Sequence, residues 1–255
     1  MRYPKLGLCE VCAVLVILCG ISSSTFEASP AAASTTGSQI AGERPSDSGM
    51  PMAVLRGKIR FTGTVPSPTL FNTAPDPSCA PFIITSEDVR VSDQGLENVM
   101  VYVSSPVASP APIGSAVTLD QRDCRFDPHV LTLQAGQALI VRNSDNTLQN
   151  VHAFTQVNTP FNTGQPIPMA TSHIFDKPEA QIPIRDDIHR WKVAYVGVFD
   201  HPYHTVSKSG GLYELRLPAG RYEITVWHEK YGKFQQTVVL KQGENPSLDS
   251  VYNVP

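Results

Sequence analysis

The chain is a succession of short apolar runs that alternate every second residue and are separated by Gly, Pro, Asn and Asp. Alternation with period two puts side chains on opposite faces of an extended strand, and β-branched and aromatic residues favour that conformation. No stretch keeps a helical period over about three turns. The clearest runs are VLRGKIRFTG, NVMVYVSS, HVLTLQAGQALIVRNSD, VAYVGVF, GLYELRLPAG, RYEITVW and FQQTVVL. Their spacing predicts an all-β fold of sandwich type.

The N-terminus predicts export rather than a part of the fold. Arg2 and Lys5 precede an apolar run, residues 11–21, and small residues follow it. A charged start, an apolar core and a small-residue exit are typical of a secretory signal peptide, which we assign to residues 1–30. The run is shorter than the roughly 20 residues that span a bilayer, and an uncleaved anchor is the alternative. We therefore expect a periplasmic or secreted protein with no stable membrane span after cleavage.

The cysteines follow from this assignment. Five are present, and Cys9, Cys12 and Cys19 lie in the predicted signal peptide. Cys79 and Cys124 then have a single pairing open to them, and an oxidising compartment favours it. Such a disulfide closes a loop of about 46 residues and contributes roughly 4 kcal/mol on the chain-entropy view. The alternative is two unpaired buried thiols.

Charge and short motifs argue against several functions. The formal net charge is −3 at pH 7 without a basic run, so we expect no nucleic-acid partner. Beyond the signal peptide the sequence has no GxSxG, no HExxH, no phosphate-binding glycine loop and no CxxC. Asp186 and Asp187 are adjacent, so on a strand they would face opposite sides and could not act as a catalytic pair. We expect no enzyme.

Two distant parts of the chain resemble the two ends of one sandwich. GKIRFTGTVP and NVMVYVSS resemble the opening of a carboxypeptidase-regulatory-like (transthyretin-like) β-sandwich, and KSGGLYELRLPAGRYEITVWHEKYGKFQQTVVLK resembles its closing hairpin. The segment between them is then an inserted domain, which loops tolerate because domain termini often lie close together. The predicted organisation is a signal peptide (1–30), a flexible linker rich in Ser, Ala and Gly (31–52), the first half of the regulatory-like sandwich (53–112), the inserted domain (113–205), the second half (206–245) and a C-terminal tail (246–255).

The inserted segment carries a second resemblance. LDQRDCRFDPHVLTLQAGQALIVRNSDNTLQNVHAF, FNTGQP and IRDDIHRWKVAYVGVFDHPYHTV resemble, in that order, a bacterial cupredoxin group often named for methylamine utilisation. That group also carries a regulatory-like module, and the resemblance extends from Val54 to Val239. It implies a cupredoxin-like Greek-key sandwich inserted into or packed beside the regulatory-like β-sandwich. Cys79 and Cys124 have counterparts in the group, which also implies the disulfide.

The resemblance implies a copper site whose ligands are mostly replaced. Blue copper is held by two imidazoles, one thiolate and a weak axial thioether. The group's His-Asn-Val motif reads QNV here, and its Cys-Asp-Val-His-Pro-Trp-Met motif reads DDIHRWK. The first His position is therefore Gln149 and the Cys position is Asp186. His189 is kept, the Met position is Lys192, and no cysteine follows Cys124.

Three interpretations of this position stay open. Lys192 is expected to pair as an ammonium with Asp186 across the former site. His152, Asp186 and His189 would instead form a mixed nitrogen and oxygen site for zinc or copper(II), although His152 lies three residues after Gln149 and so on the opposite strand face. The third interpretation is an ordinary polar pocket. We expect hydrogen-bonded structural roles for four further histidines, His129, His201, His204 and His228.

These observations predict an exported, non-enzymatic cupredoxin-like binding or structural protein with a vestigial copper site and no cofactor. The loops at the former copper end, 143–161 and 183–192, are expected to contact a protein or carbohydrate partner in the cell envelope. The alternative, which the resemblance alone implies, is a copper-binding electron-transfer protein.

Overall fold

Strands are almost the only regular secondary structure in the part of the chain that the computed structural model describes, residues 52–107, 113–243 and 246–254. The predicted signal peptide and all of the predicted linker except Met52 lie outside these residues. Within the described ranges, no helix is long and apolar enough to cross a membrane. The elements are β1 (Met52–Thr62), β2 (Val91–Ser92), β3 (Gly95–Leu96), β4 (Met100–Val103), β5 (Val117–Arg122), β6 (Arg125–Asp127), β7 (Val130–Gln134), β8 (Ala138–Asn143), β9 (Gln149–Ala153), β10 (Phe161–Gln165), β11 (Met169–Ile174), β12 (Glu179–Arg185), β13 (Val193–Phe199), β14 (His204–Val206), the short 3-10 helix η1 (Ser209–Gly211), β15 (Leu212–Pro218), β16 (Gly220–His228), β17 (Gly232–Leu240) and β18 (Ser250–Asn253).

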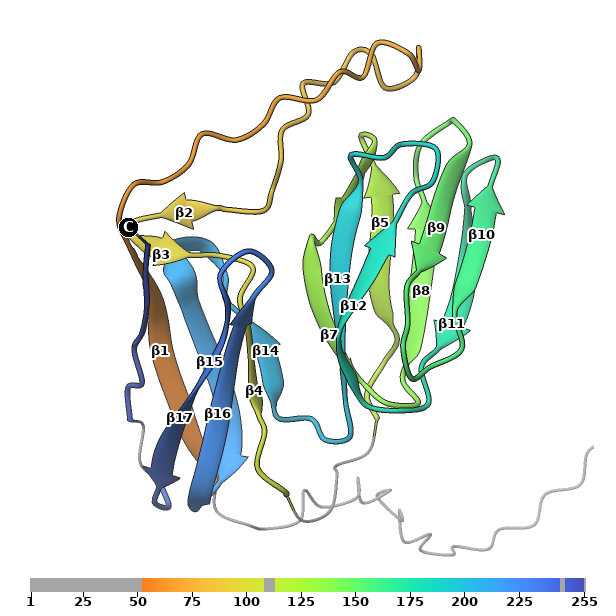
Figure 1. The fold of residues 1–255 in the computed structure, drawn as a ribbon. Helices are drawn as coiled ribbons and strands as arrows, with labels where there is room; N and C mark the ends of the chain where they lie inside the picture. The colour runs from red at the N-terminus through yellow and green to blue at the C-terminus, as the bar shows by residue number, and fades with distance from the viewer. Residues whose placement is uncertain (1–51, 108–112, 244–245, 255) are drawn as a thin grey trace, which may run out of the picture. The chain divides into compact units, whose positions relative to one another are not determined.

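The outer sandwich is built from strands at both ends of the described chain, β1–β4 and β14–β18 (Figure 1). One sheet has the order β15-β1-β3-β2 with β18 added to β1, and the other has the order β14-β4-β16-β17. Burial alternates along the whole of β1, so that Leu55, Ile59 and Phe61 enter the core. This is the period-two burial that its sequence predicts.

The inserted sandwich consists of β5–β13 and has a hydrophobic core of its own. Its sheets have the orders β10-β9-β12-β13-β7 and β11-β8-β5-β6. The pairs β13–β7 and β5–β8 are parallel, so these neighbours are joined by long connections rather than hairpins. The all-β fold class predicted from the sequence is therefore confirmed.

Strand order shows how the two sandwiches are connected. β4 and β14 pair with each other in the outer sandwich, and β5–β13 lie between them in the chain. β14 begins at His204, so the outer sandwich resumes slightly before the predicted boundary at 205. Side chains from both sandwiches also share a small buried cluster made of Met100, Tyr102, Val130, Phe199 and Trp227.

Histidines near this cluster are bonded to protein groups, as expected from the sequence. His204 Nδ1 lies 2.8 Å from Thr132 Oγ1, and His201 Nε2 lies 2.9 Å from the carbonyl oxygen of Val103. Burial lowers the pKa of His204 to about 4. His129 contacts Glu229, and the amide of Lys230 donates to His228 Nδ1.

The residues predicted to be a C-terminal tail, 246–255, contribute a strand. β18 pairs in parallel with β1, from Ile59 opposite Ser250 to Thr62 opposite Asn253. Tyr252 is buried in the core of the outer sandwich. The sequence pattern did not indicate this strand, because four residues are too few to establish an alternation.

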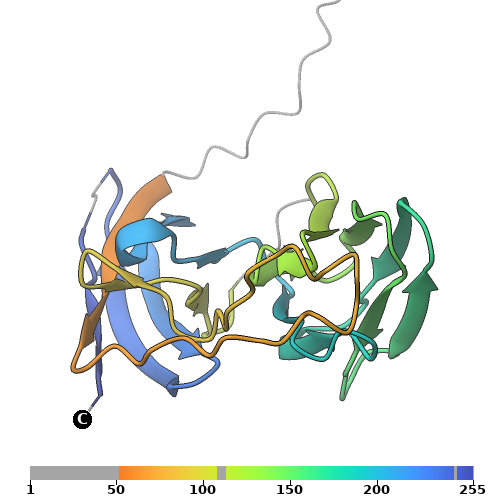
Figure 2. The same cartoon turned by 90° about the horizontal axis from the view of Figure 1, so that it is seen from above.

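The segment between β1 and β2, residues 63–90, is called the arm below. The arm leaves the outer sandwich and reaches one end of the inserted sandwich, as both views show (Figures 1 and 2). Cys79 near its tip is bonded to Cys124, and both cysteines are fully buried with Ile84. The prediction that 53–112 belong to the first half of the outer sandwich therefore does not hold for the arm. A loop without periodicity carries no sequence signal of the surface on which it packs.

Candidate functional site

A lysine ammonium occupies the interior of the inserted sandwich at its loop end. The side chain of Lys192 is fully buried, and its Nζ donates to Gln121 Oε1 at 2.7 Å, to Asp186 Oδ2 at 2.9 Å and to Gln149 Oε1. The ammonium also lies 4.5 Å from the centre of the Phe126 ring, a cation–π distance. These five residues are called the Lys192 centre below. The ion pair between Lys192 and Asp186 that the sequence predicts is present.

The strand ends and one tight loop place these groups. Gln121 and Gln149 lie on β5 and β9 and are completely buried. Asp186 follows β12, and its Oδ1 accepts the amides of Ile188 and His189, each at 2.8 Å. The amide of Lys192 then donates to the carbonyl of His189. The carboxylate therefore folds the loop that brings Lys192 back over it.

The charges in the Lys192 centre depend on each other. Burial alone would raise the pKa of Asp186, but hydrogen bonds from His189 and the Lys192 charge hold it well below 3.8. Burial lowers the pKa of Lys192 to about 8 against the attraction of Asp186. Both groups are therefore ionised at neutral pH. A buried pair of this kind tolerates loss of one partner poorly, because the other charge is then unpaired.

The residues of this centre do not fit the copper site that the resemblance implies. The position of the thiolate holds the Asp186 carboxylate, and the position of the thioether holds an ammonium. Gln149, at the position of the first imidazole, uses its side-chain oxygen to accept from that ammonium. Copper(II) and an ammonium repel each other, so a metal here would have to displace a buried, hydrogen-bonded cation.

His189 belongs to a second group beside the Lys192 centre. Its Nε2 lies 2.7 Å from Asp76 Oδ2, and its Nδ1 faces Asp186 Oδ2 at 3.4 Å. Burial alone would lower the pKa of His189, but the carboxylates of Asp186 and Asp76 outweigh it and raise the pKa. Donor atoms of Asp76, Cys79 and His189 lie within 4.8 Å of one another, as in a metal site.

The sulfur of that group is in a disulfide. Cys79 is bonded to Cys124, which confirms the predicted pairing. Asp76 was not among the residues predicted for a site, because it lies in the arm, far from His189 in the chain. The predicted disulfide was the available signal, since it places the turn around Cys79 beside the inserted sandwich.

The mixed site predicted from His152, Asp186 and His189 is not formed. His152 Nδ1 contacts Asp187 at 3.1 Å, and its ring packs on Phe154 with the centres 4.0 Å apart. Asp186 instead contacts His189 and Lys192. Because β9 is extended, the side chains of residues 149 and 152 point to opposite faces of the strand, as their spacing of three residues predicts.

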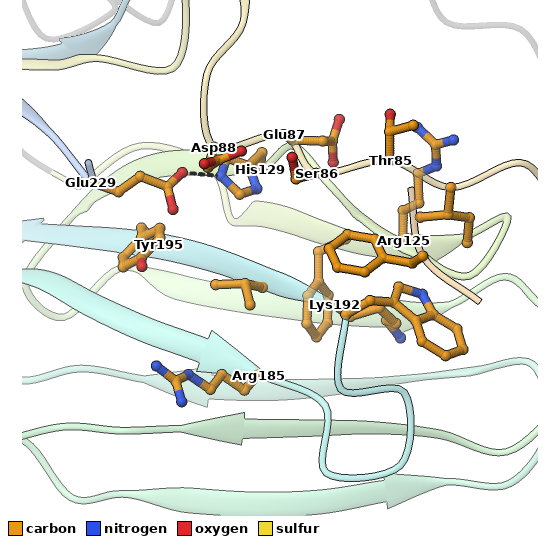
Figure 3. Close-up of a pocket in the computed structure, with 15 residues that line it drawn as sticks. Thr85, Ser86, Glu87, Asp88, Arg125, His129, Arg185, Lys192, Tyr195 and Glu229 are labelled. Carbon is orange, nitrogen blue, oxygen red and sulfur yellow. Dashed lines mark hydrogen bonds and ion pairs between the residues drawn. The ribbon is translucent and has the colours of Figure 1, made fainter. Parts of the chain in front are cut away.

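A cavity of about 260 Å³ lies next to the Lys192 centre (Figure 3). Its walls combine aromatic rings with side chains of both charges. In Figure 3, Glu229, bonded to His129, lies at one end, and Arg185 projects from the strand below. The lining residues are Phe71 and 84–88 from the arm, Arg125, Phe126, His129, Arg185 and 191–193 with Tyr195 from the inserted sandwich, and Glu229 from the outer sandwich.

Comparison with known proteins gives partial structural likeness only. No known protein family and no curated protein sequence matches the chain. A copper-containing nitrite reductase from Thermus scotoductus is similar over 37% of this chain at 20% identity and a TM-score of 0.32, and the match spans 25% of the reductase chain. Amicyanin from Paracoccus versutus is similar over 38% of this chain and 96% of its own, with 20% identity and a TM-score of 0.30. A purple cupredoxin from Nitrosopumilus maritimus is similar over 33% of this chain and 99% of its own, with 16% identity and a TM-score of 0.28. Structural similarity at this level carries no functional argument, so a functional assignment has to rest on the residues of this chain.

Proposed function

We propose that this chain is an exported, non-enzymatic binding protein of the periplasm or cell surface, in which the ammonium of Lys192 stands where a metal ion once did. The observation that carries the proposal is that every hydrogen-bond donor of the Lys192 ammonium has a partner within the protein. Lys192 Nζ donates to three side-chain oxygens, from Gln121, Gln149 and Asp186, and it is fully buried. An ammonium has three protons to donate, so the centre is complete without a further ligand.

This replacement explains why the loop end can keep its shape without copper. A metal ion at this position would connect β9, which carries Gln149, with the loop that follows β12. The Lys192 ammonium makes the same connection, because Gln149 lies on β9, Asp186 follows β12, and Gln121 lies on β5. The former site therefore has a structural role, and electron transfer through it is not proposed.

The cavity beside the centre is the proposed binding site. Ligand sites often lie where structural modules meet and combine apolar walls with a few polar groups. Trp191, Tyr195 and Phe71 supply aromatic surface, while Arg185 and Glu229 supply charged hydrogen-bonding groups. Such walls suit a hydroxyl-rich ligand, which offers apolar ring faces and many donors and acceptors. A sugar unit of a cell-envelope carbohydrate is the partner class that this chemistry favours.

The proposal predicts sugar binding and no stoichiometric copper in the disulfide-bonded protein. The protein, purified without chelators, is titrated with copper(II) and, separately, with cellobiose and with N,N′-diacetylchitobiose at millimolar concentration. Metal analysis and the visible spectrum report copper, and fluorescence reports the cavity because Trp191, one of only two tryptophans, lies in its wall. We expect a saturable fluorescence change with a disaccharide and no thiolate–copper absorption.

A matched pair of variants locates the binding. Arg185→Gln removes a cavity side chain and should weaken disaccharide binding at least about tenfold, since loss of a charged hydrogen bond costs about 1.5–3 kcal/mol. Arg216→Gln removes an exposed arginine of β15 in the outer sandwich and should leave binding unchanged. One tightly held copper per chain would overturn the replacement of the metal. Equal binding by both variants, or none by the wild type, would overturn the cavity assignment.

A further inference from the structure

A carboxylate, an imidazole and two sulfurs meet where the arm joins the inserted sandwich. Asp76 Oδ2 lies 2.7 Å from His189 Nε2, and the donor atoms of Asp76, His189 and Cys79 lie within 4.8 Å of one another. Cys79 is bonded to Cys124, so a second sulfur is adjacent. Cys79, Cys124 and His189 are buried, and Asp76 is partly exposed.

In the disulfide-bonded state this group lacks the ligands that a metal needs. Metals bind the thiolate, and a disulfide sulfur carries no such charge. The remaining pair, Asp76 and His189, already bond to each other. Breaking the sulfur–sulfur bond would add two thiolates to the nitrogen and the oxygen, which makes a complete set of four zinc ligands.

The geometry suits tetrahedral zinc. Ligand atoms about 2.0–2.3 Å from zinc stand roughly 3.3–3.8 Å apart. The donor atoms of Asp76, Cys79 and His189 already lie within 4.8 Å of one another, and reduction frees the bonded sulfur of Cys124 to move away from that of Cys79. His189 presents Nε2 to Asp76 while its Nδ1 faces the Asp186 carboxylate. A carboxylate behind a histidine ligand is the usual way in which proteins orient imidazole toward zinc.

Asp76 and Cys79 also form one rigid piece of the arm. The amides of Cys79 and Ala80 donate to the carbonyl of Asp76, and the amide of Ser78 donates to its carboxylate. When the disulfide is broken, both ligands therefore stay in the same turn. Cys124 is held separately, because Asp145 Oδ2 accepts its amide at 3.0 Å.

We propose that reduction of the Cys79–Cys124 disulfide converts this group into a zinc site held by Cys79, Cys124, His189 and Asp76. A dithiol reductant supplies two electrons and two protons: the sulfur–sulfur bond breaks, both cysteines become thiols, and the reductant becomes a disulfide. Zinc then displaces one proton from each thiol, and any proton on His189 Nε2, into solvent. This site uses neither Lys192 nor the cavity, so it goes beyond the proposed function.

The test compares zinc binding by the reduced and the disulfide-bonded protein. The protein is reduced under anaerobic conditions with a phosphine, its thiols are counted, and zinc is titrated against a chromogenic chelator. We expect one zinc per reduced chain and affinity lower by more than about 100-fold in the disulfide form, since loss of outer-shell partners alone costs 10–100-fold. Cobalt(II) in place of zinc should give the thiolate charge-transfer and d–d bands of a tetrahedral site.

Variants distinguish this site from zinc held by cysteines of an unfolded chain. His189→Gln and Asp76→Asn should each weaken zinc binding to the reduced protein by at least about tenfold. His152→Gln, which changes a histidine that contacts Asp187, should have no effect. Zinc affinity that is unchanged in both His189→Gln and Asp76→Asn would overturn the proposal. So would a loss of the near-ultraviolet circular dichroism signal on reduction that added zinc does not restore. The copper and disaccharide titrations use the disulfide-bonded protein, whereas the zinc titration tests the reduced protein. The proposed function and the proposed zinc site can therefore fail separately.

Discussion

Lys192→Met is expected to lower the free energy of unfolding by about 3–5 kcal/mol at neutral pH, the usual cost of leaving one charge of a buried pair alone. Methionine is the residue that the cupredoxin resemblance implies at this position, but it removes the cation that faces Asp186 within the Lys192 centre. The carboxylate would then face the side-chain oxygens of Gln121 and Gln149, which now accept from Lys192 Nζ. Urea unfolding followed by circular dichroism measures the change.

Two comparisons identify the cause of that loss. Lys233→Met removes an exposed lysine of β17 and should change stability by no more than about 0.5 kcal/mol. Adding Asp186→Asn to Lys192→Met removes the unpaired charge and should recover part of the stability. A loss below about 1 kcal/mol, or one that Asp186→Asn deepens, would contradict the assigned ion pair.

The loss should also depend on pH in a defined direction. In the wild type the pKa of Asp186 is depressed, so its stabilising contribution is present above about 3.8 and is lost as pH falls below that value. Without Lys192 the pKa of Asp186 rises, and acid neutralises the unpaired carboxylate. The difference between variant and wild type is therefore expected to be greatest at neutral pH and to shrink in acid.

Replacing both Cys79 and Cys124 by alanine is expected to lower the free energy of unfolding by about 4 kcal/mol. The disulfide joins residues 45 apart in the chain and ties the arm to the inserted sandwich. Without it, the arm is held to the inserted sandwich only by non-covalent contacts, such as Asp76 with His189 and Arg125 with the carbonyl of Ile83. Urea unfolding in the presence of a chelator measures the loss, and limited proteolysis should then cut first within 63–90.

Ser78→Ala, next to Cys79 and exposed, serves as the control and should cost less than about 0.5 kcal/mol. If the double alanine variant were as stable as the wild type and its arm as resistant to protease, the disulfide would not hold the arm in place.

Much of the fold could be predicted from local patterns, and the site only in part. Alternation identified the long strands such as β1, where every second side chain is buried. The cysteine count predicted the disulfide, and the ion pair between Lys192 and Asp186 was predicted from the copper-ligand positions that the cupredoxin resemblance implies. The four residues of β18 were missed, because so short a run carries no period.

Long-range placement accounts for the rest. Asp76 meets His189 only because the arm crosses to the inserted sandwich, and nothing in the arm's own sequence encodes that path. The cavity draws on three separate regions of the chain, so no local motif could reveal it. His152 was grouped with Asp186 because it lies three residues after Gln149, whereas the strand's pleat turns it toward Asp187.

The most direct test of the central claim is to observe the Lys192 ammonium itself by proton–nitrogen NMR of the nitrogen-15-labelled, disulfide-bonded protein. We expect a slowly exchanging ammonium signal that is absent from Lys192→Met and titrates near pH 8, in keeping with the lowered pKa of this group. One equivalent of copper(II) should leave this signal and those of His189 unbroadened. An ammonium that exchanges freely with water, or paramagnetic loss of both signals at one equivalent, would show that a metal and not Lys192 belongs at this position.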